Sequence, residues 1–270
     1  AADGTRKYLL ALEDGVTVES VLIPEGTRRT LCFSTQAGCA VGCLFCATGQ
    51  GGFRRQLTAG EITGQLLAVE AESGETVGNA VAMGQGEPLL NREQVFRALA
   101  LLHEPKLFGL GARRLTLSTV GVIPGIRELT ALKLPYKLAV SLHAARQEVR
   151  DRLIPAAQRY PLSDLREVLR EYADTTRNRI TFEYLLLAGV NDREADLDAL
   201  VRFGTGLPVF INLIPWNQVA GLSFHSPAER EVQRFASRLA ERGFEAAVRK
   251  EKGAEIEAAC GQLTQQKFND

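Results

Sequence analysis

Short apolar runs alternate with longer amphipathic stretches along most of this chain. Runs such as LAVSL and FINLI are apolar throughout, which is typical of parallel strands buried on both faces. The apolar runs cover residues 80–83, 115–119, 138–142, 180–187 and 209–214, and amphipathic stretches begin at Thr58, Arg92, Ile123, Ser163, Arg193 and Pro227. This alternation predicts an α/β fold of about six strand–helix units.

Local capping signals support three of the helix starts. Thr58 stands three residues before Glu61, which is the spacing of a capping box, and Ser163 offers a second capping side chain. Pro227 is suited to the first turn of the last helix, because its missing N–H would have no partner there.

The opening residues predict a β-hairpin. RKYLLALEDGVTVESVLIP contains two strand-like runs on either side of Asp14-Gly15, a dipeptide that readily adopts the positive φ angles of a tight turn. A third β-rich run, Thr30 to Gln36, leads into a loop of Cys and Gly residues. We therefore divide the chain into a hairpin extension at 1–29, a core at 30–250 and a C-terminal tail at 251–270.

The parallel strands predict where a site would lie. Six such strands can form an open doubly wound sheet or a curved partial barrel, and the hydrophobic pattern does not choose between them. In both folds the active site lies at the C-terminal ends of the strands. Polar residues at these ends are 84–87, 118–119, 141–143, Glu183 and Asn212.

The composition excludes several classes of protein. With 45% hydrophobic and 24% charged residues, a chain of 270 residues can bury a large core. The 32 basic and 32 acidic residues balance, which is untypical of a strong non-specific nucleic-acid binder. No apolar stretch reaches the roughly 18 residues of a membrane span, and no secretory signal opens the sequence. We therefore expect a cytoplasmic protein whose five cysteines form no disulfide framework.

Three cysteines in the Gly-rich loop GCAVGCLFCATG suggest a metal or cluster site. Cys39, Cys43 and Cys46 make a soft thiolate site suited to iron–sulfur or zinc. A structural zinc site needs four protein ligands, and His103 and His143 stand singly in the sequence. Three thiolates leave one iron of a cluster open to a substrate. Ordinary buried thiols, or a non-catalytic iron–sulfur or zinc regulator, remain the alternatives.

The same loop, with Phe45 before its last cysteine, resembles the radical S-adenosylmethionine (SAM) signature, and GQGEPLLN is similar to the motif that receives the SAM amino group. More narrowly, the sequence resembles the RlmN/Cfr family of radical SAM RNA methyltransferases over nearly all of its length. The segments that carry the resemblance include VESVLIPE, LTAGEI, RRLTLSTVGVIPGI, SLHA, LLAGVND, NLIPWN and AACGQL. It implies a methyltransferase with a partial (β/α)6 TIM-like barrel.

The resemblance also implies the cofactors and their ligands. Cys39, Cys43 and Cys46 would hold a [4Fe–4S] cluster whose open iron binds SAM, and reduction would cleave SAM to a 5′-deoxyadenosyl radical. The residues expected to contact SAM are Gly86 and Glu87 at the amino end, Ser118, Ser141, Leu142 and His143 at the ribose and carboxylate, and Asn212 at the adenosyl region.

Cys260, in a glycine-rich tail, is the residue that separates this family from other radical SAM proteins. By resemblance, Cys260 accepts a methyl group from one SAM, and the radical from a second SAM removes a hydrogen atom from that methyl group. The resulting methylene radical on Cys260 then adds to adenine. Cys32 would release the adduct through a transient disulfide with Cys260, and Glu19 would take the ring proton. From the residues alone, Glu19 could be a solvated strand position, Cys32 an ordinary strand residue and Trp216 core packing.

The family usually has a further N-terminal helical domain, which we expect to be absent here. The resemblance implies methylation of carbon 2 of an adenine in 23S ribosomal RNA, with transfer RNA as a further substrate. Carbon 8, the Cfr-type target that confers antibiotic resistance, is the alternative. We expect an electron donor such as flavodoxin or ferredoxin as a partner, and a monomer.

Overall fold

The structure is a computed structural model that describes residues 1–264. It divides into two compact units. Unit 1 contains Ala1–Gly42, Cys46–Ser118 and the tail from Lys252 on, and unit 2 contains Cys43–Phe45 and Thr119–Glu251. The cysteine loop therefore contributes to both units. The linear three-part division of the chain stays a prediction.

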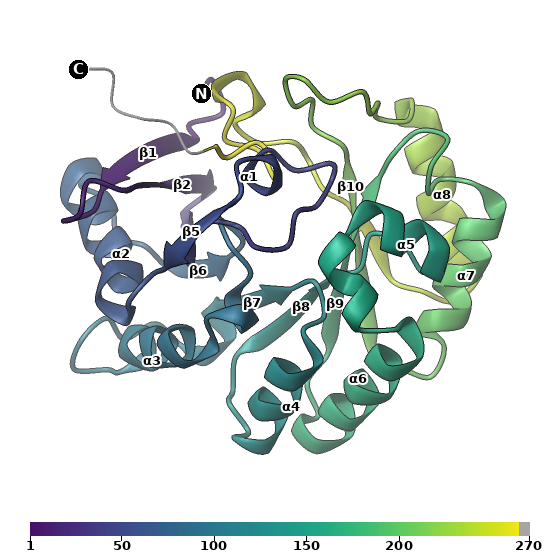
Figure 1. Ribbon diagram of the computed structural model, residues 1–270, viewed down its shortest axis with the longest axis horizontal. Coiled ribbons are helices and arrows are strands. Elements are labelled where there is room, and N and C mark those ends of the chain that lie inside the picture. The colour runs from purple at the N-terminus through teal and green to yellow at the C-terminus, as the bar shows by residue number, and fades with distance from the viewer. Residues whose placement is uncertain (265–270) are drawn as a thin grey trace. The chain divides into compact units, whose positions relative to one another are not determined.

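Unit 1 begins with the expected hairpin. Strands β1 (Arg6–Ala11) and β2 (Thr17–Glu25) pair antiparallel across the Asp14-Gly15 turn, and β3 (Arg28–Cys32) pairs antiparallel with β2. Parallel strands β6 (Asn79–Ala82) and β7 (Leu115–Thr119) then extend the sheet from β3. Helices α2 (Ala59–Ser73) and α3 (Arg92–His103) pack against each other in this unit (Figure 1).

The run from Thr30 to Gln36 is not one strand, so that part of the prediction is wrong. β3 ends at Cys32, and β4 (Gln36–Gly38) pairs with β5 (Phe53–Gln56) in a separate two-stranded sheet. The break occurs because the Gln65 side chain takes both the N–H and the C=O of Ser34, at 2.8 Å each. Those backbone groups are then not available to a neighbouring strand.

Unit 2 has four parallel strands in the order β8 (Lys137–Ser141), β9 (Ile180–Leu186), β10 (Val209–Pro215) and β11 (Ala246–Val248). The centre of β8 is fully buried, as its unbroken apolar run predicts. The unit's helices, labelled in Figure 1, are α4 (Ile123–Ala131), α5 (Gln147–Leu153), α6 (Leu162–Thr176), α7 (Glu194–Gly204) and α8 (Glu229–Glu241).

Short elements that the hydrophobic pattern did not reveal complete the chain. The one-turn helix α1 (Ala47–Gln50) follows Cys46 directly. Four 3₁₀ turns lie at Pro88–Leu90, Ala112–Arg114, Pro155–Arg159 and Ala254–Ile256. Such short elements carry too few residues to show a period.

Of the three predicted capping signals, the one at Thr58 is confirmed and the other two are wrong. Thr58 is the N-cap of α2 and forms the full capping box with Glu61. Ser163 is not an N-cap, because α6 already begins at Leu162 after Pro161. The Ser163 hydroxyl donates to the Asp164 carboxylate instead. Pro227 precedes the first turn of α8, whose N-cap is Ala228. Within residues 1–264, no helix is both long and apolar enough to span a bilayer.

We expect Thr58→Ala to lower the free energy of unfolding by about 1 kcal/mol, because the Glu61 N–H loses its acceptor. Ser163→Ala is the matched control, since Ser163 caps no helix, and should change it by less than about 0.5 kcal/mol. Urea denaturation of both variants measures the difference. Equal stabilities would contradict the role of the cap.

Candidate active site

Backbone hydrogen bonds fix the cysteine loop within each unit. In unit 1, the N–H of Cys39 donates to the carbonyl of Gly52 at 2.8 Å. In unit 2, the N–H of Leu44 donates to the carbonyl of Leu153, at the end of α5, at 3.0 Å. Cys39 before Cys43 and Leu44 after it are therefore each held by a backbone hydrogen bond.

The thiols of this loop are a fitting donor set for an iron–sulfur cluster. Burial raises the pKa of Cys39 to about 12, and burial also raises that of Cys46. These thiols stay protonated at neutral pH unless a cation replaces the proton, which is how thiolate ligation by iron proceeds. In the part of the chain that the structure describes, no three His, Cys, Asp or Glu side chains converge on one metal ion. The ligand role of Cys39, Cys43 and Cys46 stays a prediction.

Close packing explains both glycines of GQGEP. A Cβ atom on Gly84 would lie 2.6 Å from the carbonyl oxygen of Phe33, and one on Gly86 would lie 2.5 Å from Cβ of Gln36. Gly86 also has φ +101°, which side chains rarely adopt. Glu87 follows, only 3% exposed, with Oε1 accepting from the Leu89 N–H at 2.9 Å. Its charge helps to raise the pKa of Cys39, so this carboxylate lies near the cysteine loop.

His143 and Trp216 both contact the cysteine loop segment in unit 2. The ring of Phe45 meets that of His143 edge-on, with 5.0 Å between centroids, and Trp216 Nε1 donates to the Phe45 carbonyl at 3.0 Å. Trp216 is thus more than core packing. Together with the hydrogen bond from Leu44 to Leu153, these contacts hold Cys43–Phe45 against the rest of unit 2.

His143 is a neutral, oriented imidazole. Burial lowers its pKa to about 3, with a further contribution from the Arg150 charge. Its Nδ1 accepts the N–H of Leu185 at 3.0 Å, so we assign the ring proton to Nε2. Its φ of +55° turns the chain directly after β8.

Ser118, Ser141 and Leu142 lie at or next to the C-terminal ends of β7 and β8, as expected. Asn212 and Glu183 instead lie at the centres of β10 and β9, so the prediction that they stand at strand ends is wrong. Asn212 stands opposite Glu183 in the β9–β10 register, and its Nδ2 donates to Glu183 Oε2 at 2.8 Å. Burial raises the pKa of Glu183. The Leu142 side chain is fully buried, and its backbone N–H and carbonyl are both hydrogen-bonded within unit 2. Ser118 is buried and Ser141 is partly exposed.

The described tail returns to the N-terminal part of unit 1 (yellow in Figure 1) and lies against the cysteine loop. The N–H of Ala47, which follows Cys46, donates to the carbonyl of Gly261, which follows Cys260, at 2.7 Å. Thr48 Oγ1 donates to the carbonyl of Leu263 at 2.6 Å. Repulsion from Cys260 adds to the raised pKa of Cys46. Cys260 is therefore a close neighbour of Cys46.

Cys32 belongs to the hydrophobic cluster that receives the tail. It is 7% exposed and packs in one cluster with Val21, Ala258 and Leu263. The last two stand on either side of Cys260 in the sequence. None of the five cysteines forms a disulfide in this structure, so the expected transient disulfide between Cys32 and Cys260 is not formed in it.

Glu19 is fully buried, and the alternative of a solvated strand position is wrong. Its Oε1 lies 3.2 Å from Lys7 Nζ, and its Oε2 accepts the N–H of Thr264 at 2.6 Å. Burial raises the pKa of Glu19, and the Thr264 amide and Lys7 offset part of that rise.

Gln85 lies in the 84–87 segment that the sequence placed at a strand end, but no role was predicted for it. Its Nε2 donates to the carbonyl of Thr264 at 2.6 Å, so Glu19 and Gln85 hold both backbone groups of one tail residue. Its Oε1 accepts the N–H of Glu19 at 3.4 Å. The only available signal was its position between the two glycines of GQGEP.

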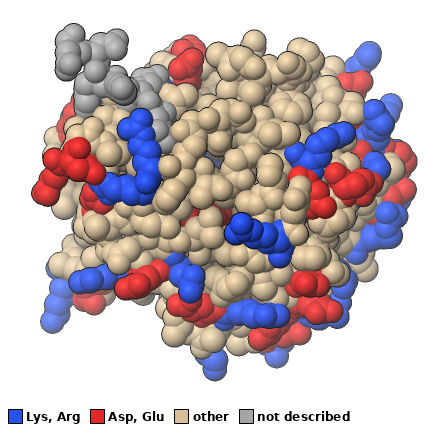
Figure 2. Space-filling model, viewed as in Figure 1, with Lys and Arg blue, Asp and Glu red and all other residues tan. Residues whose placement is uncertain are grey.

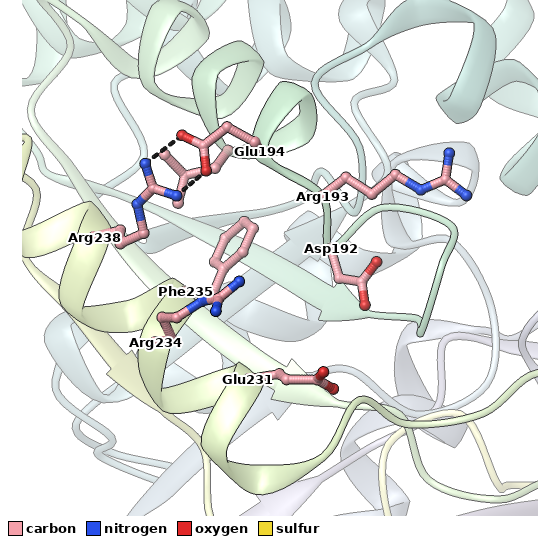
Figure 3. A pocket seen from close by; sticks show the side chains of 8 residues that line it. Asp192, Arg193, Glu194, Glu231, Arg234, Phe235 and Arg238 are labelled. Atoms are coloured by element: carbon pink, nitrogen blue, oxygen red, sulfur yellow. Dashed lines mark hydrogen bonds and ion pairs between the residues drawn. The ribbon is translucent and has the colours of Figure 1, made fainter.

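A charged surface pocket in unit 2 is separate from these residues. Its volume is about 280 Å³, and Figure 3 shows Glu194 and Arg238 facing each other across an ion pair while Arg193 points away. Acidic and basic side chains line it in equal number: Asp192, Glu194, Glu231, Arg193, Arg234 and Arg238. None of the expected site residues lines it.

Comparisons with known proteins establish the family. Residues 33–201 match the Radical SAM superfamily. A probable dual-specificity RNA methyltransferase RlmN from Moorella thermoacetica is 49% identical over 97% of this chain and 77% of its own length. The chain belongs to the RlmN/Cfr family of radical SAM enzymes. A probable RlmN from Thermotoga neapolitana is 48% identical, over 97% of this chain and 76% of its own length.

A solved structure agrees with the fold of this RlmN/Cfr family member. The crystal structure of a radical SAM methyltransferase from Sphaerobacter thermophilus matches with a TM-score of 0.94 and 44% identity, over 97% of this chain and 78% of that one. This confirms the predicted fold class, a partial (β/α)6 barrel of the radical SAM type preceded by antiparallel strands. The open doubly wound sheet is excluded.

We expect His143 to make the apoprotein acid-sensitive. Its folded pKa of about 3 lies below the ordinary 6.5, so the unfolded state binds the proton first and stability falls as pH drops through that window. The loss is at most about 1.4 kcal/mol per pH unit. His143→Gln, which can still accept the Leu185 N–H, should flatten this dependence in urea denaturation between pH 7 and pH 4. Parallel curves for the two proteins would contradict it.

Proposed function

We propose that this chain methylates a ring carbon of adenine, carbon 2, in 23S ribosomal RNA and in transfer RNA, through a methylated Cys260. One observation carries the proposal: the 2.7 Å hydrogen bond from Ala47 to Gly261 sets Cys260 beside Cys46 in the cysteine loop. The relatives named as dual-specificity RNA methyltransferases support an RNA substrate, and their RlmN type favours carbon 2 over carbon 8.

The target carbon dictates the chemistry. Carbons 2 and 8 of adenine are electron-poor and cannot attack a sulfonium methyl group, so an ordinary displacement fails. A [4Fe–4S] cluster with bound SAM supplies a 5′-deoxyadenosyl radical. Cys39, Cys43 and Cys46 would hold the cluster, and a soft thiolate set fits that task. Two SAM molecules are used per turnover, one as methyl donor and one as radical source.

The expected SAM contacts offer suitable groups. Glu87, a buried carboxylate near Cys39, would accept from the SAM amino group together with the Gly86 backbone. His143 presents a neutral ring whose Nε2–H can donate to a carboxylate or ribose oxygen. The proposed contacts also include Ser118, Ser141, Leu142 and Asn212.

Two residues would release the product. Cys32 shares a hydrophobic cluster with the residues around Cys260, which keeps the resolving thiol close to the tail that it must attack. Glu19 would take the ring proton, and its raised pKa makes its carboxylate a stronger base than an exposed one. Because Oε2 of Glu19 holds the Thr264 N–H, the base also positions the tail.

RNA binding would depend on local contacts. On the face shown in Figure 2, basic and acidic side chains lie in mixed groups, and no large region of one sign is visible. This agrees with the net charge of zero. Shape and the seated tail would therefore contribute more to recognition than a general attraction to phosphate. We further propose a cytoplasmic monomer that receives electrons from flavodoxin or ferredoxin.

The decisive experiment is mass spectrometry of the tail peptide after anaerobic reconstitution with iron, sulfide, a reductant and SAM. We expect a methyl group on Cys260. Cys43→Ala should abolish 5′-deoxyadenosine release, whereas Cys32→Ala should keep the methylated tail and accumulate a covalent protein–RNA adduct. An unmethylated Cys260 in protein that cleaves SAM would reject the proposal. Nucleoside analysis of the RNA separates carbon 2 from carbon 8.

Glu19 variants separate its two roles. Glu19→Gln keeps an acceptor for the Thr264 N–H, so the tail should stay seated while RNA methylation falls by roughly 100-fold or more from loss of the base. Glu19→Ala should lose the same activity and also make the peptide bonds around Cys260 more sensitive to limited proteolysis. If Glu19→Gln retains full methylation, another group is the base.

A further inference from the structure

Arg150 is a buried cation that none of the assigned roles explains. It lies in α5, is completely buried, and donates to the backbone carbonyls of Val120, Ser141 and Leu142. Its Nε has no hydrogen-bond partner. Among residues 1–264, no carboxylate forms an ion pair with it.

Burying a guanidinium without an anion is costly. The effective penalty is several kcal/mol per ion, and neutral carbonyls offset only part of it. Arg150 nevertheless remains positively charged at neutral pH, because burial lowers its pKa only to about 10. Buried charges in proteins are normally paired or lie beside a metal site. An anion is therefore expected in its surroundings.

The cysteine-loop segment Cys43–Phe45 is bonded to the helix that carries Arg150. A negative charge on Cys43 would raise the pKa of Arg150, and one on Asp151 would do so less. The hydrogen bond from Leu44 to Leu153 fastens the residue after Cys43 to the same helix that carries Arg150. Arg150 and Cys43 are therefore linked through one helix and one backbone hydrogen bond.

The same side chain also holds the end of a strand that is expected to contact SAM. Ser141 closes β8 and Leu142 follows it, and both offer their carbonyls to Arg150. Val120, which follows β7, offers the third. A neutral donor could make such contacts at a lower desolvation cost, so the charge itself needs an explanation.

We propose that Arg150 is the counter-cation of the cluster that Cys43 helps to hold, and that it is a positioning residue for the Ser141–Leu142 backbone. This rests on the proposed function, which supplies the cluster. One-electron reduction by the donor protein adds one negative charge to the cluster. A fixed cation nearby stabilises the reduced form more than the oxidised form, and therefore raises the reduction potential. Arg150 itself neither gains nor loses an electron.

The test is a redox titration of the reconstituted holoprotein, followed by electron paramagnetic resonance. Arg150→Gln removes the charge and should lower the equilibrium constant for reduction at least tenfold, which is 59 mV for a one-electron couple. Arg152→Gln is the matched control, because Arg152 is exposed on the same helix, and it should shift the constant by less than threefold. An Arg150→Gln potential equal to that of the control would overturn the proposal.

Arg150→Lys keeps the charge but loses most of the donors, so it tests the proposal even if Arg150→Gln fails to fold. We expect it to bind iron and to keep the equilibrium constant within threefold of the parent. Loss of the cluster, or a tenfold shift, in this variant would show that the donors rather than the charge matter. A parent protein that binds no cluster would instead contradict the proposed function itself.

Discussion

The hydrogen bond between the Ala47 amide and the Gly261 carbonyl joins segments far apart in the sequence, and the position of the tail beside the cysteine loop depends on it. It brings the cysteine of the tail to the cysteine of the loop, and two further contacts, at Thr48 and Glu19, hold the same stretch in place. Without these bonds, Ala258 and Leu263 would expose apolar surface, and Cys32 would lose part of its packing.

Burial governs the charge states of the candidate site. In a low-dielectric interior, a charged group is retained only where partners offset its desolvation. Glu19 has the opposite charge of Lys7 and a backbone amide. His143 accepts the backbone amide of Leu185 but lies near the like charge of Arg150, and it is neutral. Arg150 is the exception, since its described partners are carbonyl dipoles. These differences give each residue a distinct capacity to donate, accept or carry charge.

Local pattern sufficed for most of the secondary structure. The apolar run at 115–119 became β7 without any change, and Asp14-Gly15 marked the hairpin turn. The local pattern could not predict contacts between residues that are far apart in the sequence. The break after Cys32 depends on Gln65, which lies in α2, and the burial of Glu19 depends on a tail residue far along the chain. The resemblance supplied the tail cysteine. The sequence placed Gln85 at a strand end without a role, and it gave no signal for Arg150.

The hydrogen bonding of His143 in unit 2 limits which chemical groups its ring can bind. Because the lone pair on Nδ1 of His143 is already taken by the Leu185 amide, the ring has no acceptor left. Its single remaining polar function is an N–H. An ammonium group only donates hydrogen bonds, so it could not pair with this N–H, whereas an oxygen acceptor could. The imidazole can therefore donate one hydrogen bond but cannot accept another.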